Sequence, residues 1–184
     1  MKNEKTMKEK PIVMKYRDEL DKSYGVAGMV LGLSVLDAED LFTAVTLDGE
    51  GTECIQFTPE FFFAGNPRLS PRGAWKYILG HYRISVGLAV ANALCRRMVL
   101  DNDSVDSQLR DQLFNIAFAD GKEYCQLERD EVEPIFDEAF ENMSRLFGDS
   151  RVRRAMDSFV DTLQQRRTLS HIDVIDILQQ LNLA

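Results

Sequence analysis

The sequence contains few of the residues that catalytic and metal-binding motifs require. Its 184 residues include three cysteines, Cys54, Cys95 and Cys125, and no Cys-x-x-Cys pair. The two histidines, His81 and His171, lie far apart and in neither the His-Glu-x-x-His nor the Glu-x-x-His spacing of zinc and di-iron sites. We therefore expect reduced thiols, no disulfide framework and no resident metal ion.

Motifs for nucleotide binding and acyl transfer are also missing. The sequence has no Gly-x-x-x-x-Gly-Lys-Ser/Thr loop, no Gly-x-Gly-x-x-Gly turn and no Gly-x-Ser-x-Gly elbow. Residues 101–106 resemble the start of a calcium loop, but Asp106 replaces the turn glycine and Gln112 replaces the bidentate glutamate. We expect Asp103 or Ser104 to cap a helix there instead. The sequence predicts no cofactor and no catalytic residue, and it favours a non-catalytic protein over an enzyme.

No hydrophobic run is long enough to cross a bilayer. The two longest, Val26–Leu36 and Ile84–Leu94, have eleven residues each, whereas a membrane-spanning helix needs about 20. The first ten residues, MKNEKTMKEK, are charged and no apolar run follows them. We therefore expect no signal peptide, no membrane contact and a cytoplasmic location.

Positive charge is scarce overall but concentrated in one segment. The chain has 30 acidic and 22 basic residues, a net charge of −8, which makes nucleic-acid binding unlikely. Residues 61–100 nevertheless carry six bases and no acid, and residues 101–149 carry four bases and fourteen acids. This segregation favours a protein partner or a homo-oligomer over other kinds of partner.

The basic segment contains the candidate site. Ser70 and Pro71 are typical of a helix start, and the predicted helix runs to about residue 100. At 100° per residue, its basic side chains at 76, 83 and 97 fall about 40°, 20° and −20° from position 72. We predict a ligand- or partner-binding face formed by Arg72, Lys76, Arg83 and Arg97. The alternative is intramolecular, with this side packed in the core and its arginines paired with acids of 101–149.

Hydrophobic spacing predicts a mainly α (α+β) fold, in which a C-terminal array of about five helices joins a small N-terminal antiparallel β-sheet or hairpin. Segments 41–47 and 52–58 flank a glycine-rich turn and predict the hairpin. Segment 26–36 is either a third strand or a buried helix. A short helix is expected within 11–24, ending at Gly25.

The remaining boundaries follow from capping residues. After the long helix we expect helices over about 104–119, ended by Gly121, and 130–147, capped by Asp130 and Glu133. Two more are expected over 150–167 and 171–182, the last capped by Ser170. Short loops predict that successive helices are antiparallel neighbours. We divide the chain into a flexible tail, 1–10, and a single domain, 11–184, with an N-terminal α/β part at 11–60 and a helical array at 71–184.

Two functional hypotheses remain open. The first is a cytosolic, non-catalytic interaction or regulatory module, with self-association as one form of it. The alternative is a small anionic-ligand binder or an enzyme, with a site between the sheet and helix 71–100. Nucleic-acid binding through helix 171–182 is least favoured, because Asp173 and Asp176 would repel phosphate.

Overall fold

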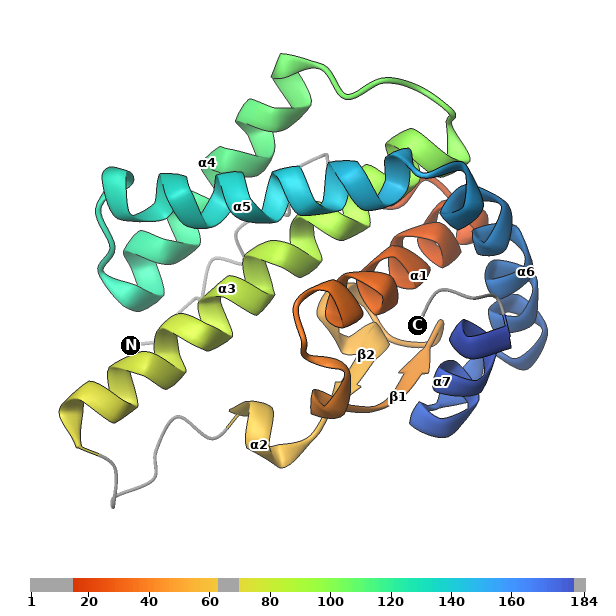
Figure 1. Ribbon diagram of the computed structural model, residues 1–184, viewed down its shortest axis with the longest axis horizontal. Coiled ribbons are helices and arrows are strands. Elements are labelled where there is room, and N and C mark those ends of the chain that lie inside the picture. The colour runs from red at the N-terminus through yellow and green to blue at the C-terminus, as the bar shows by residue number, and fades with distance from the viewer. Residues whose placement is uncertain (1–14, 63–69, 181–184) are drawn as a thin grey trace, which may run out of the picture.

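The structure is a computed structural model that describes residues 15–62 and 70–180, and it is mainly helical with one small antiparallel sheet (Figure 1). The predicted fold class is therefore confirmed. The predicted tail, 1–10, lies outside the described residues. The longer elements, in chain order, are α1 (Glu19–Val35), β1 (Phe42–Thr46), β2 (Ile55–Phe57), α2 (Pro59–Phe62), α3 (Pro71–Cys95), α4 (Ser107–Cys125), α5 (Arg129–Gly148), α6 (Ser150–Arg166), β3 (Thr168–Ser170) and α7 (His171–Gln180).

Helices α1 and α3 form an antiparallel pair at the centre of the core. The glycines of α1 face α3 so closely that a Cβ atom added at Gly28 would lie 2.4 Å from the Cβ of Cys95. Segment 26–36 is thus a buried helix, and its interpretation as a strand is wrong. The predicted end of a helix at Gly25 is also wrong, because Gly25 lies inside α1 and packs against Asn92. These glycines permit close helix packing rather than a turn.

The sheet has the strand order β2-β1-β3, with both pairs antiparallel. The β1–β2 pair confirms the predicted hairpin, although β2 is only three residues long. The third strand comes from the other end of the chain, where Leu169 pairs with Val45. Residues 168–170 gave no strand signal because three residues are too few to establish an alternating pattern.

The four predicted C-terminal helices are present, but several of their ends differ from the predictions. Helix α4 continues through Gly121 and ends at Cys125, where Gln126 adopts a left-handed conformation with φ 56°. Its N-cap is Asp106, not Asp103 or Ser104. Helix α5 is capped by Glu128 and Glu131 rather than by Asp130 and Glu133. The predicted cap of α7 is correct, because Ser170 and Asp173 exchange hydrogen bonds.

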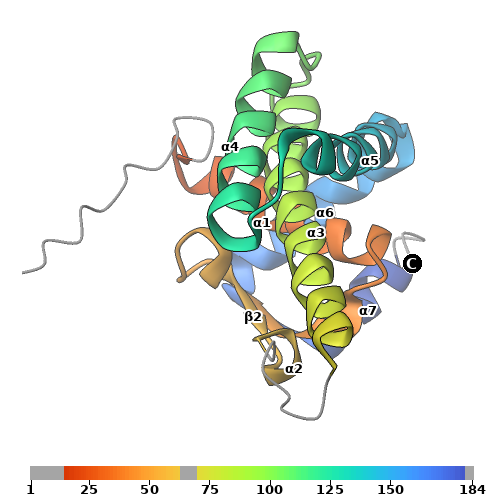
Figure 2. The ribbon, with the colours of Figure 1, turned by 90° about the vertical axis from the view of Figure 1, so that its left-hand side faces the viewer.

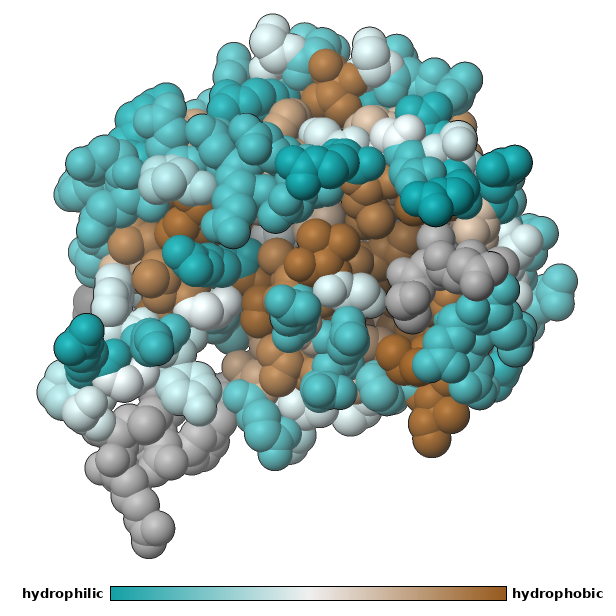
Figure 3. All heavy atoms as spheres, in the orientation of Figure 1, coloured by the Kyte–Doolittle hydropathy of each residue, from teal (hydrophilic) through white to brown (hydrophobic). Residues whose placement is uncertain are grey.

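The helices are not all antiparallel neighbours. Helix α4 runs back alongside α3, whereas α5 crosses both and α6 turns away from the end of α5 (Figures 1 and 2). Apolar side chains gather in a hollow across the middle of the face shown in Figure 3, below α5. The first turns of α3 extend beyond this body at the lower left of Figure 1, so one half of α3 belongs to the core and the other to the surface.

The long helix also meets a simple criterion for a membrane span. Among the described residues one helix, Pro71–Leu100, is long and apolar enough to cross a bilayer, and 56% of its most apolar stretch is buried inside the protein. Core helices of globular proteins meet the same criterion. The burial of Val86, Val90 and Leu94 agrees with the prediction that this stretch is a core segment.

Candidate functional site

The structure separates the four basic residues that the sequence placed on one face. Arg72, Lys76 and Arg83 are exposed on the projecting half of α3. Within residues 15–62 and 70–180, none of these three forms an ion pair. Arg97 lies at the far end of the helix, in a π-helical segment, Arg96–Leu100, that continues α3.

Arg97 follows the intramolecular alternative. Its guanidinium lies 2.7 Å from Asp103 and 3.6 Å from Asp106, and its Nε donates a hydrogen bond to the carbonyl of Ser104. Both carboxylates belong to the acidic segment 101–149. These contacts tie the start of α4 to the end of α3, so we assign Arg97 a structural position.

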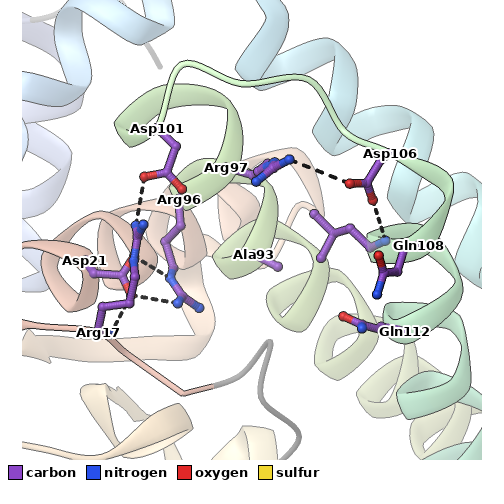
Figure 4. A pocket seen from close by; sticks show the side chains of 10 residues that line it. Arg17, Asp21, Ala93, Arg96, Arg97, Asp101, Asp106, Gln108 and Gln112 are labelled. Carbon is purple, nitrogen blue, oxygen red and sulfur yellow. Dashed lines mark hydrogen bonds and ion pairs between the residues drawn. The ribbon is translucent and has the colours of Figure 1, made fainter.

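A charged cluster beside Arg97 escaped the sequence analysis (Figure 4). The Asp21 side chain is 1% exposed and accepts hydrogen bonds from Arg96 at 2.6 and 2.9 Å. It also accepts hydrogen bonds from the backbone and the guanidinium of Arg17, and Arg17 pairs in addition with Asp101. Arg96 further donates to the carbonyl of Lys15. The cluster therefore fastens the segment before α1 to the end of α3.

The electrostatics of this cluster argue against catalysis there. Burial by itself would raise the pKa of Asp21, but the hydrogen bonds from Arg96 and Arg17 lower it to about 2. Asp21 is thus ionised and fully engaged at neutral pH, and it is unsuited to act as a general base. The adjoining pocket, of about 280 Å³, is lined by three arginines and three aspartates, so its charges balance.

A different pocket lies on the projecting half of α3, where the chain turns from the sheet towards that helix. This groove has a volume of about 380 Å³. Its walls are mostly apolar, and Lys76, His81 and Glu60 are the polar residues beside it. The groove is lined by Leu41, Glu60, Phe61, Lys76, Tyr77, Gly80, His81 and Ile84. We call it the α3 groove.

Gly80 forms part of the α3 groove, and the fold itself does not require a glycine there. Among the described residues, no atom outside the neighbouring helical turns lies within 4 Å of the position that a Cβ atom would take. Glycine inside a helix costs roughly 1 kcal/mol relative to alanine. At Gly87, by contrast, a Cβ atom would lie 2.5 Å from Leu36. Internal packing thus explains Gly87 and leaves Gly80 without an internal explanation.

Two exposed aromatic side chains lie on the first turns of α3, and one of them, Tyr77, lines the groove. The exposed fractions of Trp75 and Tyr77 are 42% and 55%. Trp75 lines a second, smaller hollow between α3 and α5, and Arg83, Glu131 and Glu138 line the same hollow. The basic residues thus form a ridge between two hollows. We call the ridge, its aromatic neighbours and Gly80 the α3 surface; it consists of Arg72, Trp75, Lys76, Tyr77, Gly80 and Arg83.

The cysteines are buried, and His81 lies against an aromatic ring. The His81 ring lies against that of Phe61, with centroids 4.1 Å apart and an interplanar angle of 32°, and desolvation by burial lowers the pKa of His81, which favours the neutral imidazole. All three cysteines are buried, and burial raises the pKa of the Cys95 and Cys125 thiols. In the same residues no group of three or more His, Cys, Asp or Glu side chains is placed to hold a metal ion.

Some of these features had a signal in the sequence and others had none. A glycine at position 80 inside a strongly predicted helix was visible, as was the lone tryptophan at 75. The contribution of Phe61 and Leu41 to the groove depends on how the hairpin packs against α3, which spacing along the chain does not contain. Nor does any pattern connect Asp21 to Arg96, because 75 residues separate them.

Comparison with known proteins adds no family assignment. No protein-family model matches the sequence, and no curated protein matches it. The function is therefore inferred from the geometry of the α3 surface and its groove.

Proposed function

We propose that this protein is a non-catalytic interaction module that binds a protein partner through the α3 surface. The observation that carries the proposal is Gly80, a glycine inside a helix that keeps an apolar groove open although nothing in the described fold occupies it. A residue that weakens its own helix without an internal reason is expected where another molecule approaches.

The composition of the α3 surface supports a protein as the partner. Aromatic and arginine side chains are enriched in protein interfaces, and Trp75, Tyr77 and Arg72 are all exposed on the first turns of α3. These side chains lie on a regular helix that is anchored in the core by its second half. A rigid element loses little conformational freedom on binding, which favours affinity.

The same groove would also take a small anionic ligand, which is the alternative function. Its location between the hairpin and α3 fits that hypothesis, and Lys76 would supply the charge. Two features make it the weaker proposal. Desolvation lowers the pKa of His81 and so favours its uncharged form, and Glu60 adds a carboxylate to the lining of the groove. A small anion inside the groove would thus meet Lys76 with Glu60 opposing it, whereas a larger acidic partner would also reach Arg72 outside the groove.

Site-specific photo-crosslinking in the native host tests the proposed function. Tyr77 is replaced by the photo-crosslinker p-benzoylphenylalanine, and the matched control carries it in place of Tyr124, which is 73% exposed at the end of α4. We expect a discrete protein adduct from position 77 and none from position 124. The absence of an adduct at 77, or equal adducts from both positions, would contradict the proposal.

A further inference from the structure

The chemistry of the α3 groove identifies the class of partner it fits. The inference rests on the proposed function, and it starts from a contact that the protein makes within itself. On α3, Gly87 receives the Leu36 side chain, which lies so close that any Cβ atom there would clash at 2.5 Å. Leu36 follows the last residue of α1. A branched aliphatic side chain at the end of a helix thus fills the site over a glycine of α3.

Gly80 precedes Gly87 by one heptad, so the two glycines lie on nearly the same side of α3, about 20° apart. The side of α3 that takes Leu36 in the core therefore continues outwards to Gly80. There it borders apolar walls formed by Leu41, Phe61 and Ile84. The equivalent occupant at Gly80 is a leucine or isoleucine side chain, and in the described residues no such side chain reaches it.

The charge of the α3 surface indicates which kind of residue surrounds that side chain in the partner. Arg72 and Lys76 are exposed and, within the described ranges, form no ion pair, and no acid lies between residues 61 and 100. The chain as a whole has a net charge of −8. An acidic partner is therefore repelled by the net charge of the chain and attracted at the basic ridge, which favours binding there.

We propose that the α3 groove binds an acidic amphipathic helix of another protein. The helix inserts a leucine or isoleucine side chain over Gly80 and places its carboxylates beside Arg72 and Lys76. This arrangement is helix-in-groove recognition, in which apolar residues three, four and seven positions apart anchor the helix. Tyr77 lines the groove, is 55% exposed and contributes apolar area to the contact.

The test uses the full-length protein and a synthetic helical peptide of about 18 residues, long enough to be partly helical alone. The peptide has leucines along one face, glutamates elsewhere and a fluorescent label, and its control has lysine for every glutamate. Fluorescence anisotropy measures both affinities. We expect the acidic peptide to bind at least about tenfold more tightly, which corresponds to about 1.4 kcal/mol.

Two variants locate the binding site. Lys76→Glu reverses the charge on the ridge, and we expect it to weaken binding of the acidic peptide at least about tenfold. Lys122→Glu changes an exposed lysine of α4 and should leave the affinity unchanged. Equal binding of the two peptides, or an equal loss in both variants, would overturn the proposal.

Such a result together with a specific adduct at Tyr77 would reject the acidic helix and keep the docking surface. An adduct with twice the mass of the chain would identify a second copy as the occupant and also overturn the acidic-helix proposal.

Discussion

At the scale of single residues, the buried carboxylate of Asp21 connects α1 to the end of α3. Asp21 neutralises Arg96, whose side chain is only 11% exposed, and both belong to helices that pack against each other in the core. Removing one partner of such a pair leaves a buried charge without compensation, which is more costly than replacing both partners. Arg17, which is 55% exposed, is the peripheral member of the cluster.

We predict that Asp21→Asn lowers the free energy of unfolding by about 3–5 kcal/mol, because Arg96 then remains buried without a counter-charge. Urea denaturation followed by circular dichroism measures the change. Asp101→Asn is the matched control, since its partner Arg17 is exposed, and it should cost less than about 1 kcal/mol. Similar losses in the two variants would contradict the structural role given to Asp21.

The same carboxylate makes stability depend on pH. The pKa of Asp21 in the folded protein is about 2, below its ordinary value of 3.8. A lowered folded-state pKa contributes stability above the unfolded value, and this contribution is lost as the pH falls. We expect the wild type to lose about 2 kcal/mol from this group between about pH 5 and pH 2. Urea titrations of the wild type and Asp21→Asn across that range measure the difference; parallel pH profiles would be inconsistent with this assignment.

Gly80 is expected to behave in the opposite way to a packing glycine. Alanine at this position meets no atom of residues 15–62 and 70–180 outside the neighbouring turns, and it removes a flexible residue from a helix. We predict that Gly80→Ala raises the free energy of unfolding by about 0.5–1 kcal/mol. The same urea experiment measures it, and a destabilised Gly80→Ala protein would show that the fold itself needs the glycine.

At the scale of elements, the α1–α3 pair depends on small residues. A Cβ atom at Gly28 would lie 2.7 Å from the backbone oxygen of Ala91 as well as against Cys95, so the helices would have to separate. We predict that Gly28→Ala lowers the free energy of unfolding by about 1–3 kcal/mol, the usual cost of overpacking. Gly80→Ala is the control, because it adds the same methyl group to the exposed half of α3. An unchanged midpoint for Gly28→Ala would mean that α1 and α3 are not so tightly packed.

The elements also show how far the sequence determines the fold. Helices α5, α6 and α7 were predictable, because their apolar residues recur at helical spacing and capping or glycine residues mark their ends. Segment 26–36 was ambiguous because it is apolar on all sides, so helical and strand periodicities are equally compatible with it. The end of α4 was predicted at the wrong residue for a related reason. Gly121 is required by the nearby Tyr82 ring and not by a turn.

The candidate site was predictable only in part. The bases at 72, 76 and 83 could be placed on one side of a helix from their spacing alone. Spacing gave Arg97 the same side, but its partners Asp103 and Asp106 hold it in the π-helical continuation of α3. The groove required tertiary structure, because its walls come from the hairpin region and α3 together.

At the scale of the whole molecule, α3 serves two purposes along its length. Its second half is buried between α1 and α5 and holds the core together, while its first half carries the α3 surface into solvent. The anchored half fixes the position of the exposed half, which is how rigid scaffolds present binding residues. Under the proposed function, the weaker helix at Gly80 is a trade-off between stability and an open groove.

The most direct test of this account is the yield of the photo-crosslinked adduct from position 77 in a Gly80→Leu background. Leucine fills the groove, has a higher helix propensity than glycine and, in the part of the chain that the structure describes, meets no neighbouring atom at its Cβ. We predict that the adduct is lost, because the leucine side chain blocks the partner. We also predict that the free energy of unfolding is not reduced, because the substitution leaves the fold intact. An undiminished adduct in a stably folded Gly80→Leu protein would contradict the claim that the α3 groove is where the partner binds.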